Sequence, residues 1–195
     1  MRIGKSNRKT KETQIEVEVD LDGGQLAQIG TGIGFFDHML EAFAKNAGIG
    51  LKVSAQGDLK TGAHHTIEDI GICVGEAVAQ ALGDKKGINR YGFFILPMDD
   101  ALAQVALDFG GRAYCRADAK FSEQSIGGFE TGAFPEFFSG FAQGARANVN
   151  AKCAEGENGH HKLEALFKAF GRALKAAVAQ DEKAKGQVPS TKGVI

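Results

Sequence analysis

Cysteine is scarce in this sequence, and the cysteines that occur form no recognisable pattern. Cys73, Cys115 and Cys153 are odd in number and widely spaced, and none of them belongs to a CxxC pair. Such spacing favours reduced thiols over a disulfide framework. We therefore expect a cytoplasmic protein.

Excess charge of one sign and long apolar runs are also missing. The formal net charge is −1, so there is no electrostatic case for binding nucleic acid or an anionic membrane. No uncharged apolar run approaches the roughly 18 residues of a membrane span, and Met1–Lys5 leads into no signal-peptide core. With 43% hydrophobic and 24% charged residues, the chain has the composition of an ordinary soluble globular protein.

Histidine, in contrast, is concentrated in two short segments. The pattern HHxxE occurs at His64–Glu68 and again at His160–Glu164, and these copies hold four of the five histidines. On a helix, residues i and i+4 share a face, so the first histidine and the glutamate of each copy can share a target. The middle histidines, His65 and His161, are turned roughly 100° away. Two such copies could therefore enclose two metal ions.

The rest of the chain alternates short strands with amphipathic helices. Alternating apolar and acidic residues predict a half-buried antiparallel strand over 13–22. The helical spacing of apolar residues predicts helices over 35–47, 64–82, 134–147 and 160–178. Further short strands are expected over 51–53, 91–98, 102–109, 112–119 and 149–151.

The two halves of the chain match each other beyond the HHxxE copies. When His38 is aligned with Glu136, the apolar positions that follow them agree over about fifty residues. This repeat predicts an α+β fold made of two similar units, over 1–87 and 88–195. Each unit is expected to be a small sheet backed by two helices, and the two units to pack through their helices into one compact domain.

Equivalent places in the repeat carry all the candidate metal ligands. Mixed imidazole and carboxylate ligation without thiolate argues against a structural zinc finger. It suits Mn²⁺, Fe²⁺, Zn²⁺ or Co²⁺ in sites that keep positions open for a substrate, and the ligands alone do not identify the metal. The candidate ligands are His38, His64, His65, Glu68, Glu136, His160, His161 and Glu164.

Six short motifs, in order along the chain, resemble one known family. The motifs are Phe36–Leu40 (FDHML), His64–Asp69 (HHTIED), Gly87–Gly92 (GINRYG), Pro97–Asp99 (PMD), His160–Glu164 (HHKLE) and Pro189–Gly193 (PSTKG). With these motifs the chain resembles the imidazoleglycerol-phosphate dehydratases of histidine biosynthesis, and the similarity runs from Glu12 to the C-terminus.

The resemblance implies a fold, an activity and an assembly. The fold would be a duplicated unit of a four-stranded sheet and two helices, like domain 2 of ribosomal protein S5. The activity would be that of a hydro-lyase with two Mn²⁺ per active site, in which Fe²⁺, Zn²⁺ or Co²⁺ could replace manganese. The subunits would assemble into a cubic shell of about 24 copies with active sites shared between chains.

The resemblance also assigns roles to residues. The eight candidate ligands would hold the two ions, and the tail would be ordered against the substrate phosphate. The implied catalytic residues are Glu12, His65 and His161. The implied substrate-binding residues are Glu12, Arg90, Arg112, Lys168, Ser190, Thr191 and Lys192.

The implied reaction converts imidazole glycerol phosphate to imidazole acetol phosphate and water. The C2 hydrogen of the glycerol chain is not acidic by itself, because no carbonyl group is adjacent to it. A metal-bound imidazolate could expel the C1 hydroxyl to give a diazafulvene, which would acidify that hydrogen. Glu12 is our candidate for the acid/base at the reacting carbons.

The chain departs from the family pattern at a few positions. Glu136 stands where many members have histidine, and a carboxylate can replace it as a ligand. Asn46, Ala63 and Asn150 stand where histidine, aspartate and histidine are usual. These departures affect the expected contacts around the ligands and the metal preference, but not the two sites themselves.

Two other functions compete with this interpretation. A metal-storage protein could use the same ligands, but storage requires no phosphate-binding Arg and Lys residues. A di-metal phosphatase would rely on aspartates and a bridging water, whereas this ligand set is rich in imidazole.

Overall fold

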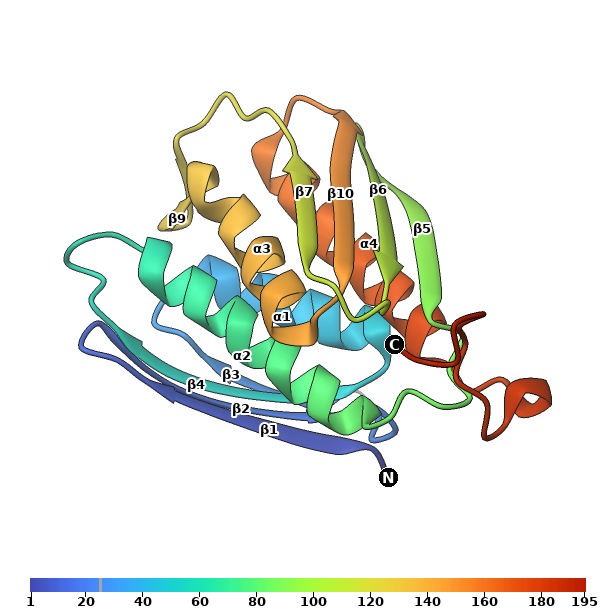
Figure 1. Ribbon diagram of the computed structural model, residues 1–195. Helices are drawn as coiled ribbons and strands as arrows, with labels where there is room; N and C mark the ends of the chain where they lie inside the picture. The colour runs from blue at the N-terminus through green and yellow to red at the C-terminus, as the bar shows by residue number, and fades with distance from the viewer. Residues whose placement is uncertain (25) are drawn as a thin grey trace.

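Two sheets enclose a double layer of helices. The computed structural model describes residues 1–24 and 26–195, and over these residues the strands form two four-stranded sheets and a short hairpin. Each sheet is covered on one face by helices, and the two helical layers meet in the centre (Figure 1). The predicted α+β class and the packing of the halves through their helices are confirmed.

The first sheet has the strand order β1-β2-β4-β3. Strands β1, β2 and β4 are antiparallel neighbours, and β3 runs parallel to β4. The elements of this half are β1 (Ile3–Lys9), β2 (Thr13–Asp20), β3 (Ala27–Gly30), α1 (Gly34–Ala47), β4 (Gly50–Gly57) and α2 (His64–Leu82).

The second sheet has the equivalent order β5-β6-β10-β7, again with a parallel pair at one edge. The duplicated unit is thus confirmed, whereas the boundary after residue 87 stays a prediction.

The elements of the second half are β5 (Tyr91–Met98), β6 (Ala101–Asp108), β7 (Tyr114–Asp118), α3 (Phe134–Ala145), β10 (Asn148–Glu155) and α4 (Gly159–Val178). Between β7 and α3 lie the hairpin strands β8 (Ser125–Ile126) and β9 (Phe129–Glu130) and the 3-10 turn Thr131–Ala133, and a second 3-10 turn, Glu182–Ala184, follows α4.

Helices α2 and α3 touch through their backbones. A Cβ atom built on Gly71 or Gly75 of α2 would collide with the carbonyl oxygen of Phe137 or Phe141 on α3. In return, a Cβ atom on Gly140 would collide with the carbonyl oxygen of Glu68. Small residues spaced four apart on both helices therefore allow this close approach, as in other tightly packed helix pairs.

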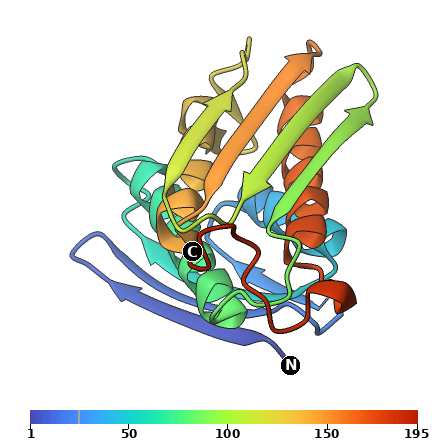
Figure 2. The ribbon, with the colours of Figure 1, turned by 45° about the vertical axis from the view of Figure 1, so that its right-hand side comes forward.

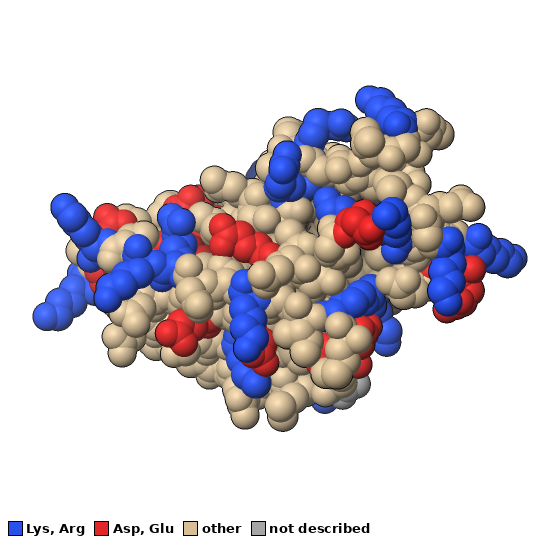
Figure 3. All heavy atoms as spheres, turned by 60° about the horizontal axis from the view of Figure 1, so that its bottom comes forward, with Lys and Arg blue, Asp and Glu red and all other residues tan. Residues whose placement is uncertain are grey.

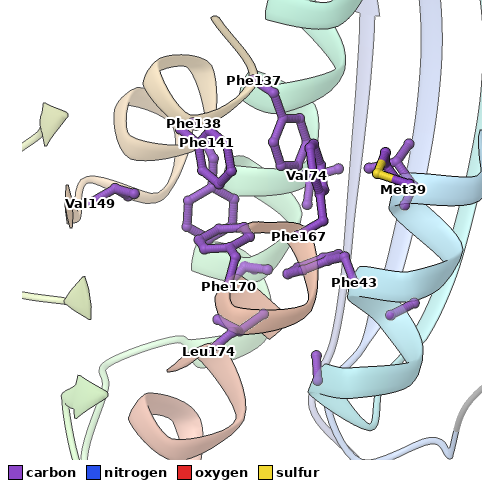
Figure 4. Close-up of a cluster of buried hydrophobic side chains, with 14 of the residues drawn as sticks. Met39, Phe43, Val74, Phe137, Phe138, Phe141, Val149, Phe167, Phe170 and Leu174 are labelled. Carbon is purple, nitrogen blue, oxygen red and sulfur yellow. The ribbon is translucent and has the colours of Figure 1, made fainter. Parts of the chain in front are cut away.

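Phenylalanine rings fill the space where α1, α3 and α4 meet (Figure 4). Phe170 of α4 stacks on Phe43 of α1 with ring centroids 4.9 Å apart, and it meets the Phe141 ring edge-on at 4.9 Å. All three rings are completely buried. Since each buried ring of this size contributes roughly 1.5–3 kcal/mol, the cluster fixes the helical layer from which the histidines project.

Strand β1 is not predicted by the sequence, because its inner face carries almost no apolar residues. Its buried positions are Gly4 and Ser6, and a Cβ atom on Gly4 would collide with the carbonyl oxygen of Ala77 in α2. Gly92 of β5 makes the equivalent approach to α4, where its Cβ would lie 2.7 Å from the nitrogen of Ala177. Close sheet–helix contact thus replaces the expected apolar alternation.

Smaller differences concern the ends of elements. Strand β3 is also absent from the sequence-based expectation, and β7 begins at Tyr114 rather than at residue 112. Helix α3 ends at Ala145, before the predicted end at residue 147, because Arg146 takes a left-handed conformation with φ of 51°.

The outer face of the first sheet is charged. Glu18 of β2 pairs with Lys5 of β1 at 2.7 Å and with Lys52 of β4 at 2.9 Å. Hydrogen bonds from Lys5 and Lys52 lower the pKa of Glu18 to about 2. Figure 3 shows acidic and basic side chains interspersed on this side of the molecule. Within the described residues, no helix is both long and apolar enough to cross a membrane.

The close contact of α2 and α3 makes Gly71→Ala a test of the fold. We expect this change to destabilise the protein by about 1–3 kcal/mol, because the new methyl group has no room. The matched control is Gly34→Ala in α1, where nothing lies within 4 Å of the added Cβ. Urea unfolding of both variants measures the effect, and equal midpoints for the two would contradict the close packing.

Candidate functional site

The β8–β9 hairpin lies against the starts of three helices. A Cβ atom on Gly127 would lie 2.9 Å from Cβ of Phe35 at the start of α1. Glu130 approaches Gly62 just before α2, and the Gly159 amide of α4 donates a hydrogen bond to Glu123 at 3.3 Å. These contacts bring the beginnings of α1, α2 and α4 together, and all five histidines lie in or next to these first turns.

Helices α1 and α4 bring three predicted ligands into one group. His38, His160 and Glu164 each offer a ligand atom, and these atoms all lie within 4.8 Å of one another. Glu164 Oε2 lies 3.0 Å from His160 Nε2 and 3.7 Å from His38 Nε2. The edge of the Phe35 ring packs against His160 with centroids 5.0 Å apart, which fixes the plane of the imidazole.

The carboxylate of this group is kept ionised. Glu164 is 10% exposed, whereas the two imidazoles are about half exposed. Burial raises the pKa of Glu164, but the hydrogen bond and charge of Lys168, 2.7 Å away, leave that pKa below its ordinary value. Two imidazoles and an ionised carboxylate with open solvent beside them form a donor set that fits a divalent metal ion.

The equivalent residues of the other helix pair are less closely gathered. Glu136 on α3 and Glu68 on α2 are half-buried, and His64 at the start of α2 is exposed. Among the described residues, only the group of His38, His160 and Glu164 brings three such ligand atoms within 4.8 Å of one another. Because α2 packs on α3 as α4 packs on α1, these residues still occupy corresponding places in the repeat.

The middle histidines point toward carboxylates that the sequence patterns did not single out as site residues. His65 Nδ1 lies 3.1 Å from Asp58, and hydrogen bonding to this carboxylate raises the pKa of His65. His161 Nδ1 lies 2.6 Å from Asp100, with the same effect on the pKa of His161. The sequence pattern does not predict these contacts, since Asp58 lies in the loop between β4 and α2 and Asp100 in the turn between β5 and β6.

Glu12 lies in the tight turn between β1 and β2. Its side chain is 54% exposed, and its carboxylate lies 3.8 Å from His65 Nδ1. The turn is held by Thr10, whose hydroxyl accepts hydrogen bonds from the amides of Glu12 and Thr13, each at 3.0 Å. The Thr13 hydroxyl in turn donates to the buried Asp69 at 2.5 Å. The structure therefore presents Glu12 to solvent from a fixed backbone.

Arg90 anchors the C-terminal tail. Its Nε and Nη2 atoms donate to Asp108 at 2.6 and 3.1 Å, and its Nη1 donates to the carbonyl of Pro189 at 2.9 Å. The hydrogen bonds to Asp108 raise the pKa of Arg90. One N–H on each terminal nitrogen remains free to bind an anion. Arg90 also has φ of 71°, an uncommon value for a residue other than glycine.

The other predicted phosphate-binding residues divide between the two ends of the molecule. Ser190, Thr191 and Lys192 follow Pro189, and Gly111, next to the exposed Arg112, lies beside the C-terminal Ile195. Figure 2 shows this tail below the second sheet. Lys168, in contrast, lies on α4 one turn after Glu164.

The candidate metal ligands His160 and Glu164 and the C-terminal tail therefore lie at opposite ends of α4. The Arg90 amide donates to the carbonyl of Ala177, close to the end of α4, whereas His160 lies at its start. At 1.5 Å per residue, these positions are about 25 Å apart along the helix.

The positions that depart from the family pattern also lie in different places. Asn46 donates to the carbonyl of Ala42 at 2.9 Å, about 12 Å along α1 from His38. Ala63 is buried just before α2, and Asn150 is exposed on the outer face of β10.

Comparison with known proteins identifies a single family. The family model described as imidazoleglycerol-phosphate dehydratase matches residues 31–174. An imidazoleglycerol-phosphate dehydratase of Lacticaseibacillus casei is 52% identical over 100% of both chains. The histidine biosynthesis bifunctional protein HisB of Spirosoma linguale is 53% identical over 96% of this chain, which covers 49% of that longer protein. The crystal structure of imidazoleglycerol-phosphate dehydratase from Staphylococcus aureus superposes with a TM-score of 0.82 at 38% identity, over 91% of this chain and 99% of that one.

The Arg90 contacts make Asp108→Ala a test of how the tail is held. Without the carboxylate, Arg90 loses its fixed position, and we expect the amides of residues 190–193 to exchange hydrogen at least about tenfold faster. This factor follows from the roughly 1.5–3 kcal/mol that a hydrogen bond to a charged group contributes to stability. The control Asp84→Ala removes an exposed carboxylate that pairs with Lys86. Unchanged exchange in Asp108→Ala would show that the tail is held by other contacts.

Proposed function

The chain belongs to the imidazoleglycerol-phosphate dehydratase family, and from this membership we propose that it dehydrates imidazole glycerol phosphate to imidazole acetol phosphate in histidine biosynthesis. The chain is thus an enzyme of the hydro-lyase class. The observation that carries the proposal is the group of His38, His160 and Glu164, because it occurs in a chain that matches the family from end to end.

The proposed enzyme depends on metal. Two imidazoles and an ionised carboxylate would hold one ion, and the corresponding residues Glu136, His64 and Glu68 would contribute to a second. His65 and His161 complete the eight ligands. Mn²⁺ is the proposed metal, with Fe²⁺, Zn²⁺ or Co²⁺ as alternatives that the same donor set accepts. When bound, the metal would supply the positive charge that acidifies the imidazole ring of the substrate.

The phosphate of the substrate would be bound by basic side chains and the tail. Arg90 offers its two free N–H groups, and Arg112, Lys168 and Lys192 add positive charge. The hydroxyl groups of Ser190 and Thr191 would donate further hydrogen bonds to the phosphate oxygens. Holding the phosphate in this way positions the imidazole end of the substrate for reaction.

Glu12 would transfer the proton at the reacting carbon. Its carboxylate is exposed on a fixed turn beside His65, so a bound substrate can reach it. In the proposed reaction Glu12 takes the hydrogen on C2 of the glycerol chain as a proton and gives this proton to the hydroxyl on C1. The C1–O bond breaks as the C1=C2 double bond forms, and the hydroxyl leaves as water. The resulting enol then becomes the ketone.

Each active site would be shared between copies of the chain. Arg90 and the metal ligands of one chain are about 25 Å apart along α4, which is too far for one small substrate to touch both. The phosphate-binding end of one copy must therefore meet the metal-binding end of another. Exposed apolar residues on β5, such as Phe93 at 75% and Ile95 at 57%, provide surface for such contacts. The full assembly is proposed to be the shell of about 24 subunits.

A cytoplasmic location completes the proposal. It is supported by Cys73, Cys115 and Cys153, all of which are free thiols.

Removing and restoring the metal tests the proposed function. Protein stripped with a chelator should lose turnover of imidazole glycerol phosphate, and refilling with Mn²⁺ should restore it with about two ions bound per chain. Bound ions without turnover would favour metal storage. Turnover by fully stripped protein would overturn the metal dependence.

Mixing two inactive variants tests the shared site. His160→Ala damages the metal-binding end and Arg90→Ala damages the phosphate-binding end, so each variant alone should be inactive. If the two are dissociated, mixed and reassembled, some sites will combine an intact metal-binding end with an intact phosphate-binding end, and activity should reappear. Each variant taken alone through the same procedure is the control. No recovery in the mixture would mean that both ends of a site come from one chain.

A further inference from the structure

Each middle histidine has one ring nitrogen occupied by an aspartate. His65 Nδ1 lies 3.1 Å from Asp58 Oδ2, and His161 Nδ1 lies 2.6 Å from Asp100 Oδ1. Both rings remain partly exposed, at 40% and 29%. Because the two ring nitrogens lie on different sides of the imidazole, a proton held on Nδ1 leaves the lone pair of Nε2 for another ligand.

Asp100 is held in place by hydrogen bonds from the backbone. Its Oδ2 accepts hydrogen bonds from the backbone amides of Glu157 and Asn158, at 2.6 and 3.1 Å, just before α4 begins. Its other oxygen faces His161. Asn158 caps the same helix by accepting from the His161 amide at 3.2 Å. The carboxylate and the ring it orients are therefore fixed to the same helix end. The exposed Asp99 lies 3.4 Å from His161 Nε2, so a metal ion bound at this nitrogen would also lie near the Asp99 carboxylate.

Asp58 is held by a different local structure. Its carboxylate accepts from the Thr61 hydroxyl at 2.8 Å, and its backbone carbonyl accepts from the Thr61 amide at 2.8 Å. This turn follows β4, whereas Asp100 lies in the turn between β5 and β6. The two carboxylates thus come from non-equivalent places in the repeat. In the strand order, the residue equivalent to Asp100 is Glu12, in the turn between β1 and β2.

We propose that Asp58 and Asp100 are positioning residues that hold His65 and His161 with Nδ1 bonded and Nε2 directed to a metal ion. The inference rests on the proposed metal-dependent function. In the second half, the carboxylate of the strand turn orients the histidine directly. In the first half, Asp58 takes over that contact, and Glu12 remains 3.8 Å from the ring with its carboxylate available for the substrate.

Metal titrations of Asp58→Asn and Asp100→Asn test this proposal. Free Mn²⁺ is followed by electron paramagnetic resonance during titration of the assembled, stripped protein. Loss of an aspartate that orients a metal-bound histidine weakens metal binding by about 10- to 100-fold. Each variant should weaken the binding of one of the two ions and leave the binding of the other unchanged, because each ion is expected to use one middle histidine. Asp58→Ala and Asp100→Ala should weaken metal binding at least as much, since alanine cannot accept a hydrogen bond from the Nδ1–H group.

The control is Asp84→Asn, which removes an exposed carboxylate paired with Lys86 and should bind both ions normally. If a variant loosened the whole fold, the binding of both ions would weaken and the melting temperature would fall. This result would overturn the positioning role. Unchanged binding of both ions in the Asp58 and Asp100 variants would also overturn it, while the turnover of the unaltered protein would still support the proposed function. If the unaltered protein binds no Mn²⁺, the proposed metal dependence fails and this inference fails with it.

Discussion

The contact between α2 and α3 determines how the two halves of this protein fit together. Gly71 and Gly75 of one helix face Gly140 and Gly144 of the other, so the helix backbones meet with no side chains between them. The space beside this contact is filled by phenylalanine rings from α1, α3 and α4. Because α2 and α4 carry the HHxxE motifs at their starts, the packing of the helical layer also determines where these imidazoles lie. The candidate site thus depends in part on a contact between two helix backbones.

The same arrangement explains why one chain would not make a complete active site. Helix α4 carries His160 at its start and binds the Arg90 turn at its end, so the length of a rigid helix separates the two functions. Arg90 is held at the end of α4 that lies away from the ligands. It pairs with Asp108, and it directly precedes strand β5. Under the proposed function, a monomer would have two incomplete ends, and its exposed apolar residues on β5 would offer a surface for assembly.

The sequence could predict the features that depend on period and repetition. The HHxxE helices, the duplicated α+β unit and the pairing of His160 with Glu164 follow from residue spacing, since a helix places i and i+4 together. The addition of His38 to this pair could not be predicted, because it depends on how α1 packs against α4. Strand β1 could not be predicted, because Gly4 and Ser6 replace the apolar residues of its buried face. The contacts of Asp58 and Asp100 could not be predicted either, because they depend on loops that only the folded chain brings to the helix ends. The opposite placement of Arg90 and His160 likewise required the path of the chain around α4.

The two halves differ at the strand turn that faces the middle histidine of each half. Glu12 and Asp100 lie in equivalent turns, and each approaches the middle histidine of its own half. Asp100 is bound by two backbone amides and by the ring, so its carboxylate is fully engaged. Glu12 does not bind the histidine ring in this way, because Asp58 pairs with His65 instead. In the proposed enzyme, a repeat with two similar candidate metal sites would therefore still supply one carboxylate with a different task, and a dehydration that removes a single proton from carbon would need only one such group.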